Sequence, residues 1–115
     1  MTKRGSVVWA PDPFNAQEAN PRPWLVISGS RMPYSDDESI AVALTTQSHH
    51  PGRIEVDDQD WVRGAPKRGS YVLPWTVATL KHDVHVVGMQ GSVTDSFLER
   101  VREETISYLQ NSPDH

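Results

Sequence analysis

Apolar residues occur along the first half of the chain in short runs between polar, turn-forming segments. Runs rich in β-branched and aromatic residues cover 7–9, 24–28, 40–46 and 53–56. Runs of this length, bounded by Pro, Gly, Asp or Asn, are typical of strands. The pattern therefore predicts short strands in close succession. It also predicts a polar, proline-containing loop at 15–22 and a second loop that begins at Gly29.

The next apolar segment is interrupted by a proline. Residues 71–73 run directly into Pro74, and two further runs at 76–80 and 84–89 flank a turn predicted at His82 and Asp83. Proline lacks the N–H that a strand ladder needs, so within sheets it is confined to edges, bulges and bends. We therefore expect the strand to stop, bulge or bend at Pro74.

Only the C-terminal part of the chain has a helical period. The positions that fall on one stripe are Phe97, Leu98, Val101, Thr105, Tyr108 and Leu109. Thr94 is the expected N-cap, and Val93 is placed to pack against Leu98 as a hydrophobic staple. Several short strands followed by one helix predict a mainly β fold. We expect a strongly curved antiparallel sheet or small barrel with a C-terminal α-helix, in one domain over residues 1–115.

The charge balance restricts how the chain can bind a nucleic acid. The formal net charge is −4, with acidic clusters at 36–38 and 55–60 and basic clusters at 3–4 and 63–68. General nucleic-acid binders carry a net basic balance, so contact with RNA must be confined to a local site or face. No cysteine is present, which excludes disulfides and thiolate chemistry. No apolar run is long enough for a membrane span or a signal peptide, and we expect a cytoplasmic protein.

Familiar catalytic motifs are absent from the sequence. It contains no HExxH, no GxxxxGK[ST], no GxSxG and no GxGxxG. His82 and His85 lie three residues apart in a strand-turn region and should point in different directions, so we expect no metal there. His49 and His50 adjoin the Pro51-Gly52 turn. They are either solvated loop residues or proton carriers beside a bound phosphate.

Two segments carry residue types suited to phosphate chemistry. In residues 22–28, Arg22 stands between prolines at the start of an apolar strand. It is either a surface ion-pair partner or an oriented phosphate clamp. In residues 44–48, Thr45 and Thr46 reflect either simple strand propensity or hydroxyl donors aimed at a phosphate. Taken one at a time, each segment fits the structural interpretation better than the functional one.

Taken together and in order, these segments resemble the MazF/PemK toxin family. Gly-Ser-Val-Val-Trp at 5–9, Arg-Pro at 22–23 and Leu-Thr-Thr-Gln-Ser at 44–48 match the family's motifs, and the spacing agrees over nearly the whole chain. The resemblance implies a homodimer of SH3-like barrels, the toxin of a type II toxin–antitoxin system. Such a toxin cuts single-stranded RNA at selected sequences without a metal or cofactor, and it binds a cognate antitoxin protein.

The resemblance also assigns roles to particular residues. The family's arginine carries over to Arg22, and the first threonine of its T-x-Q motif carries over to Thr45. The implied reaction is attack of the ribose 2′-hydroxyl on the adjacent phosphate, which needs a base, a charge clamp and an acid. The candidate catalytic residues are Arg22, Thr45, Thr46 and His49. The candidate substrate-binding residues are Trp24, Ser28, Gln47, His50 and Trp75, although a tryptophan in so small a domain is more often a core residue.

One departure from the family pattern concerns the general base. Many members carry an acidic residue at the strand end where this chain has Leu-Pro-Trp-Thr at 73–76. Either a histidine (His49, His50 or His82) replaces it, or the chain binds RNA without cutting it. The alternative function is therefore a non-catalytic SH3-like barrel that binds nucleic acid or a protein partner. Recognition of double-stranded DNA is disfavoured by the net charge and by the lack of a recognition helix.

Overall fold

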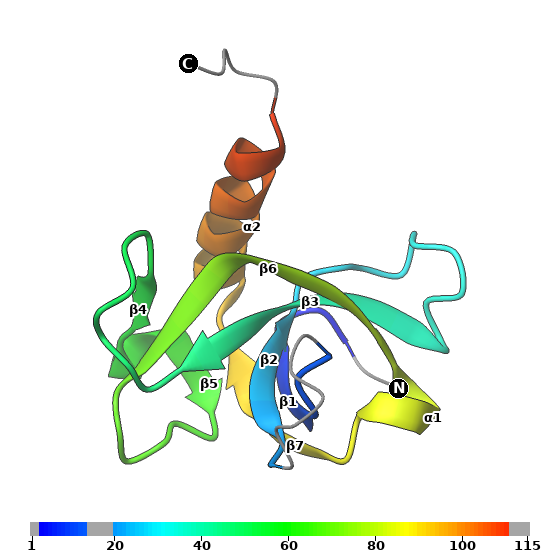
Figure 1. Ribbon diagram of the computed structural model, residues 1–115, viewed down its shortest axis with the longest axis horizontal. Helices are drawn as coiled ribbons and strands as arrows, with labels where there is room; N and C mark the ends of the chain where they lie inside the picture. Colours follow the sequence, from blue (N-terminus) through cyan, green and yellow to red (C-terminus); the bar gives the residue numbers. More distant parts are fainter. Residues whose placement is uncertain (1–2, 14–19, 111–115) are drawn as a thin grey trace.

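Seven strands form one antiparallel sheet that curls into a nearly closed barrel (Figure 1). The computed structural model describes residues 3–13 and 20–110, and all structural statements refer to these. The strands are β1 (Ser6–Ala10), β2 (Arg22–Val26), β3 (Glu38–Thr45), β4 (Ile54–Val56), β5 (Trp61–Arg63), β6 (Ser70–Lys81) and β7 (Gly88–Val93). The helices are α1 (His82–His85), α2 (Asp95–Leu109) and the single 3₁₀ turn η1 (Asp58–Asp60). The strands are ordered β4-β6-β3-β2-β1-β7-β5, which confirms the predicted mainly β barrel with a C-terminal helix.

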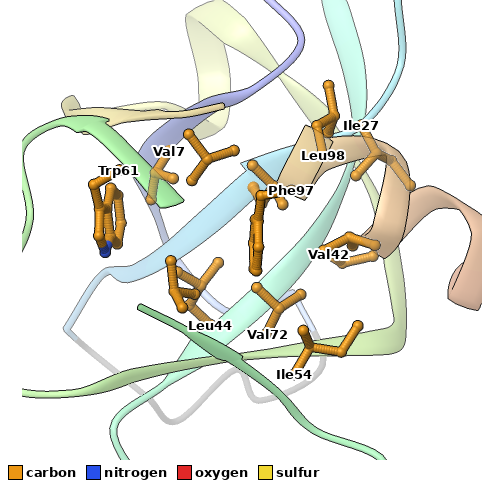
Figure 2. Close-up of a cluster of buried hydrophobic side chains, with 13 residues drawn as sticks. Val7, Ile27, Val42, Leu44, Ile54, Trp61, Val72, Phe97 and Leu98 are labelled. Atoms are coloured by element: carbon orange, nitrogen blue, oxygen red, sulfur yellow. The ribbon is translucent and has the colours of Figure 1, made fainter. Parts of the chain in front are cut away.

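The curved sheet is buried on both faces, because alternate side chains along a strand point to opposite sides. On β2, Leu25 belongs to the cluster inside the barrel, whereas Trp24 and Val26 belong to a cluster on the outer face. Helix α2 covers one end of the barrel. Figure 2 shows its Phe97 and Leu98 among strand side chains of the inner cluster. Burial on both faces explains why the strand runs are apolar without a clean alternation.

Strand β6 does not end at Pro74 but bends there. Val42 pairs with Val77 and Ala43 with Leu73, so residues 74–76 bulge out opposite two consecutive residues of β3. The Thr76 hydroxyl donates to the Leu73 carbonyl at 2.6 Å and accepts from the Ala43 N–H at 2.9 Å. The buried Thr105 hydroxyl of α2 donates to the Pro74 carbonyl at 2.8 Å. Two threonines thus satisfy the backbone groups that the bulge removes from the ladder, which lets one twelve-residue strand serve both halves of the barrel.

The expectations for residues 57–93 were partly wrong. Residues 82–85 form the short helix α1 rather than a turn followed by a strand, and β7 begins only at Gly88. Side-chain and loop partners favour the helical turn, because the Lys81 N–H donates to His85 Nδ1 and the His82 N–H to the Asp37 carbonyl. Strand β5 has no counterpart in the predicted elements. Its three residues are too few to show an alternation of apolar and polar positions.

The edge between β5 and β7 is closed by a direct backbone approach. A Cβ on Gly64 or on Gly91 would collide with backbone atoms of the other segment, since Gly64 Cα lies 2.9 Å from the Cβ position of Gly91. On its other side, β7 pairs with β1 through a second bulge, in which Gln90 is the extra residue between the Val7–Gly91 and Val8–Met89 pairs. Bulges of this kind redirect a side chain.

Helix α2 begins as predicted and ends differently. Thr94 caps it by accepting from the Phe97 N–H at 3.2 Å, and Val93 and Leu98 share the inner cluster. The stripe is buried through Thr105, but Tyr108 is 50% and Leu109 75% exposed. The C-terminal half of the helix extends past the barrel, as Figure 1 shows. Residues 15–19 of the predicted first loop lie outside the described residues, and Arg22 belongs to β2. Within the described residues, no helix is long and apolar enough to cross a membrane.

The β6 bulge yields a stability prediction. Thr76→Val keeps the side-chain shape but leaves the Ala43 N–H and the Leu73 carbonyl without their partner, so it should lower the free energy of unfolding by about 1–3 kcal/mol. Thr79→Val, on an exposed position of the same strand, is the matched control and should change little. Urea denaturation at one protein concentration measures both. Equal effects of the two substitutions would show that the Thr76 hydroxyl does not support the bulge.

Candidate functional site

A groove of about 540 Å³ lies at the barrel edge where β2 begins and β3 ends. Trp24 pairs with Ala43, and the same antiparallel register carried two residues further brings Arg22 opposite Thr45. The residues that line the groove are Trp9, Pro21, Arg22, Pro23, Leu44, Thr45, Thr46, Gln47, His50, Pro66, Ser70, Leu73 and Gln90. The two segments singled out in the sequence therefore meet in one cavity.

Arg22 is held by a carboxylate. Its Nη1 donates to Asp12 Oδ2 at 3.1 Å, and the two side chains are 32% and 11% exposed respectively. A guanidinium has five N–H donors in a planar fork, so this bond leaves further donors for another anion. The structure thus contains the ion pair that was one interpretation of Arg22. It also places the guanidinium at the groove wall, as the other interpretation requires.

The threonine segment presents one buried and one exposed hydroxyl. Thr45 is 8% exposed, and its Oγ1 accepts from the Gln47 N–H at 3.1 Å. This turn uses a lone pair of the hydroxyl and leaves its proton available for donation. Thr46 and Gln47 are exposed and also line the groove. Both threonines and Gln47 therefore border the same space as Arg22.

A row of rings leads away from the groove. The His49 and His50 ring centroids lie 4.2 Å apart, those of His50 and Trp75 lie 6.4 Å apart, and Trp75 meets Tyr108 edge-on at 6.2 Å. His50 lines the groove, whereas His49 contributes only through its contact with His50. The β6 bulge explains why Trp75 is 40% exposed instead of buried in the sheet.

Three of the candidate residues lie away from the groove. Trp24 is 1% exposed, its Nε1 donates to the Ala10 carbonyl at 3.2 Å, and no base can stack on it there. Ser28 lies beyond the other end of β2, where its Oγ accepts from the Ile40 N–H. His82 is bonded to Ser39 Oγ and to the Asp36 carbonyl, also remote from the groove. Trp24, Ser28 and His82 therefore do not line this groove, and their assigned roles in substrate binding and as an alternative base stay predictions.

Other residues in the groove, and the carboxylate that holds Arg22 beside it, were missed by the sequence analysis. Asp12 was interpreted only as part of a turn, although an acid fixed between two prolines next to a strand was a usable signal. Trp9 is 36% exposed and was taken only as a strand residue. Gln90 reaches the groove through the β7 bulge, which no local pattern indicates. Among the described residues, no three His, Asp or Glu side chains come together in a way that would hold a metal ion.

The fold and the groove define a class: small antiparallel β-barrels with a C-terminal helix and an arginine–threonine groove at the barrel edge. Residues 3–109 match the family described as PemK-like, MazF-like toxin of type II toxin–antitoxin system. The chain belongs to this family, which confirms the resemblance drawn from the motifs. No curated protein sequence matches the chain closely enough to add to this.

Solved structures agree with the fold. An endoribonuclease in complex with its cognate antitoxin, from a mycobacterial species, is 23% identical with a TM-score of 0.69, covering 97% of each chain. An endoribonuclease from a mycobacterial species is 22% identical with a TM-score of 0.71, covering 94% of this chain and 90% of that one. The MazF chain matched in a MazE-MazF structure from Deinococcus radiodurans is 19% identical with a TM-score of 0.70, covering 96% and 97%. At these identities the likeness concerns the fold.

Proposed function

We propose that this chain is a toxin endoribonuclease that cuts single-stranded RNA at selected sequences by attack of the ribose 2′-hydroxyl on the adjacent phosphate. The products are a 2′,3′-cyclic phosphate and a 5′-hydroxyl, and no metal takes part. The observation that carries the proposal is the presence of Arg22, Thr45 and His50 in one groove. These side chains supply a cation, a hydroxyl donor and a titratable base, which are groups that this reaction uses.

Arg22 acts as the charge clamp. Negative charge accumulates on the non-bridging oxygens as the 2′-oxygen bonds to phosphorus, and a planar guanidinium binds two such oxygens at once. Asp12 is a positioning residue, because its carboxylate holds Nη1 and fixes the plane of the fork. A prepositioned cation stabilises the transition state without having to reorient during the reaction.

Thr45 supports the developing oxyanion. Its Oγ1 is fixed by the Gln47 N–H, which directs the remaining hydroxyl proton toward other acceptors. Thr46 offers a second hydroxyl on the exposed side of the same strand end. A threonine hydroxyl donates a hydrogen bond at neutral pH but is too weak an acid or base to transfer the proton itself.

His50 acts as the base and takes the proton of the attacking 2′-hydroxyl, and His49 supports it by ring contact. As the bond between phosphorus and the 5′-oxygen breaks, that oxygen takes a proton from the histidinium or from water and leaves as the 5′-hydroxyl. None of the groove-lining side chains in the described residues is acidic, and His50 is the histidine that lines the groove. Bases of single-stranded RNA stack on aromatic rings, and Trp9 and Trp75 expose ring surface beside the groove. The amides of Gln47 and Gln90 are suited to reading base edges, which would give the cut its sequence preference.

We further propose two protein partners. The mycobacterial relative was solved in complex with its cognate antitoxin. An antitoxin segment that fills the groove of this chain would block access of RNA to Arg22 and Thr45. A second copy of the chain is the other partner. Exposed apolar side chains on the free half of α2, including Ile106 and Leu109, are consistent with further association. Light scattering of the purified chain measures its oligomeric state directly.

Cleavage of a mixed RNA pool in EDTA tests the reaction. The wild-type chain should yield fragments with 5′-hydroxyl ends at recurring sequences, and Arg22→Ala and Thr45→Val should each reduce the rate by about 100-fold or more. Arg31→Ala removes an exposed arginine outside the groove and is the matched control. Intact RNA in the presence of folded protein that still binds RNA would favour the non-catalytic barrel instead.

The Asp12–Arg22 contact predicts coupling between two substitutions. Asp12→Asn should lower kcat/KM by about tenfold through loss of the charged partner, yet it should have almost no effect in an Arg22→Ala background. The same double-mutant cycle can be measured on binding alone, as the affinity for an RNA that carries a 2′-deoxy sugar at the cleavage site and therefore cannot be cut. Independent, additive losses in both readouts would show that Asp12 does not act through Arg22.

An imidazole base predicts a pH dependence. A general base works only when deprotonated, so cleavage should slow as the solution is acidified from about pH 8 to about pH 5, the range in which histidines gain a proton. His50→Gln should reduce the rate and remove most of this slope, whereas His85→Gln, outside the groove, should keep both. A wild-type profile that stays flat over the range would rule out a histidine base.

A further inference from the structure

A second cavity, of about 380 Å³, lies at the opposite end of β2 from the groove. Ser28 borders it, six residues along the chain from Arg22, which corresponds to about 20 Å of extended strand. The lining residues are Lys3, Arg4, Ser28, Gly29, Ser30, Ser35, Asp36 and Ser39. None of them lines the groove, so a ligand here would be separate from RNA bound there.

The lining is locally basic in an acidic protein. Lys3 and Arg4 oppose a single carboxylate, that of Asp36, whereas the whole chain carries a formal net charge of −4. The Arg4 stem passes over Gly29, with its Cδ 3.7 Å from where a Cβ would stand, so this side chain follows the cavity wall. Of the residues that the structure describes, no carboxylate lies within ion-pair distance of either cation. Both cations line the cavity, where an anion from solution can contact them.

Hydroxyl groups line the space between the cations. Ser28 Oγ accepts from the Ile40 N–H at 2.9 Å, so its own proton remains to be donated. Ser30 and Ser35 form no hydrogen bond to another protein group in the described part of the chain, and both border the cavity. Three hydroxyls beside two cations match the acceptor-only oxygens of a phosphate.

His82 holds the far wall of the cavity in place. Its backbone N–H donates to the Asp37 carbonyl at 2.8 Å, and its Nδ1 lies 3.0 Å from the Asp36 carbonyl. A carbonyl only accepts, so Nδ1 carries the proton. In the neutral ring Nε2 then accepts from the Ser39 hydroxyl at 2.7 Å. The wall formed by residues 36–39 is therefore fixed before any ligand arrives, which lowers the entropic cost of binding.

We propose that this cavity binds a compact small molecule that carries a phosphate monoester, with Lys3 and Arg4 on the phosphate oxygens. A terminal phosphate presents three unesterified oxygens, against two on an RNA linkage, so Lys3 and Arg4 can each contact a separate oxygen. The cavity volume lies near the lower end of small-molecule sites, which fits a phosphate with a body of a few carbon atoms. Binding here neither needs nor competes with the RNA chemistry of the groove.

Calorimetric titration of the full chain with inorganic phosphate, ribose 5-phosphate and neutral ribose tests the proposal. Both phosphates should bind saturably and ribose should not. The joint change Lys3→Ala/Arg4→Ala should weaken binding by at least about tenfold, and Ser30→Ala, at an exposed loop position, should weaken it less. Asp36→Asn should strengthen binding by removing the opposing charge. Arg31→Ala, the matched loss of one exposed cation, and Arg22→Ala, in the groove, should leave it unchanged.

Three results would overturn the proposal. The first is an absence of saturable binding at phosphate concentrations up to about 10 mM. The second is loss of binding in Arg22→Ala with retention in Lys3→Ala/Arg4→Ala, which would place the phosphate in the groove. The third is binding of a 5′-phosphorylated oligoribonucleotide at Lys3 and Arg4 without binding of ribose 5-phosphate, which would make an RNA end the ligand. RNA cleavage by these variants is a separate readout, so failure here would leave the proposed nuclease untouched.

Discussion

The hydroxyls of Thr76 and Thr105 hold the bend in β6, and the arrangement of the barrel depends on that bend. They replace ladder partners at Leu73, Pro74 and Ala43, so the strand turns without leaving buried polar groups unsatisfied. Before the bend β6 pairs with β4 and the end of β3, and after it with the beginning of β3. The same bend ties α2 to the sheet and turns Trp75 outward beside His50. The bend in β6 therefore determines both how the core closes and where Trp75 lies beside the groove.

The net charge of the whole chain and the local charges at the groove have different effects on an approaching anion. A chain with a net charge of −4 repels a polyanion at long range, so the proposed binding of RNA depends on short-range contacts in the groove. Pairing with Asp12 lowers the net positive charge presented by Arg22 while fixing its direction. Such a site favours a phosphate that arrives in one orientation over non-specific adhesion.

How much the sequence could predict depended on how local each feature is. Periodicity and caps predicted the helix after Thr94 and most of the strands. Arg22 and Thr45 meet in one groove because they lie at the paired ends of two neighbouring strands. Features set by distant partners were not predictable in this way. Strand β5 exists through its pairing with β7, and Gln90 reaches the groove only through a bulge opposite β1. The burial of Trp24 and the position of Ser28 away from the groove could not be predicted from their closeness to Arg22 along the chain, because successive residues of a strand point to opposite faces and each residue extends the strand.

The pairing of β1 with β7 determines when the groove can form during synthesis of the chain. Trp9 and Gln90 border the same groove, and the two strands that carry them are more than seventy residues apart in the chain. Long-range strand pairing is a late and slow event in folding, because the loop must close before any contact compensates its entropy. A chain still attached to the ribosome therefore has no complete groove until β7 has emerged. Synthesis itself delays assembly of the groove, and a partner protein can meet the chain before the groove is complete.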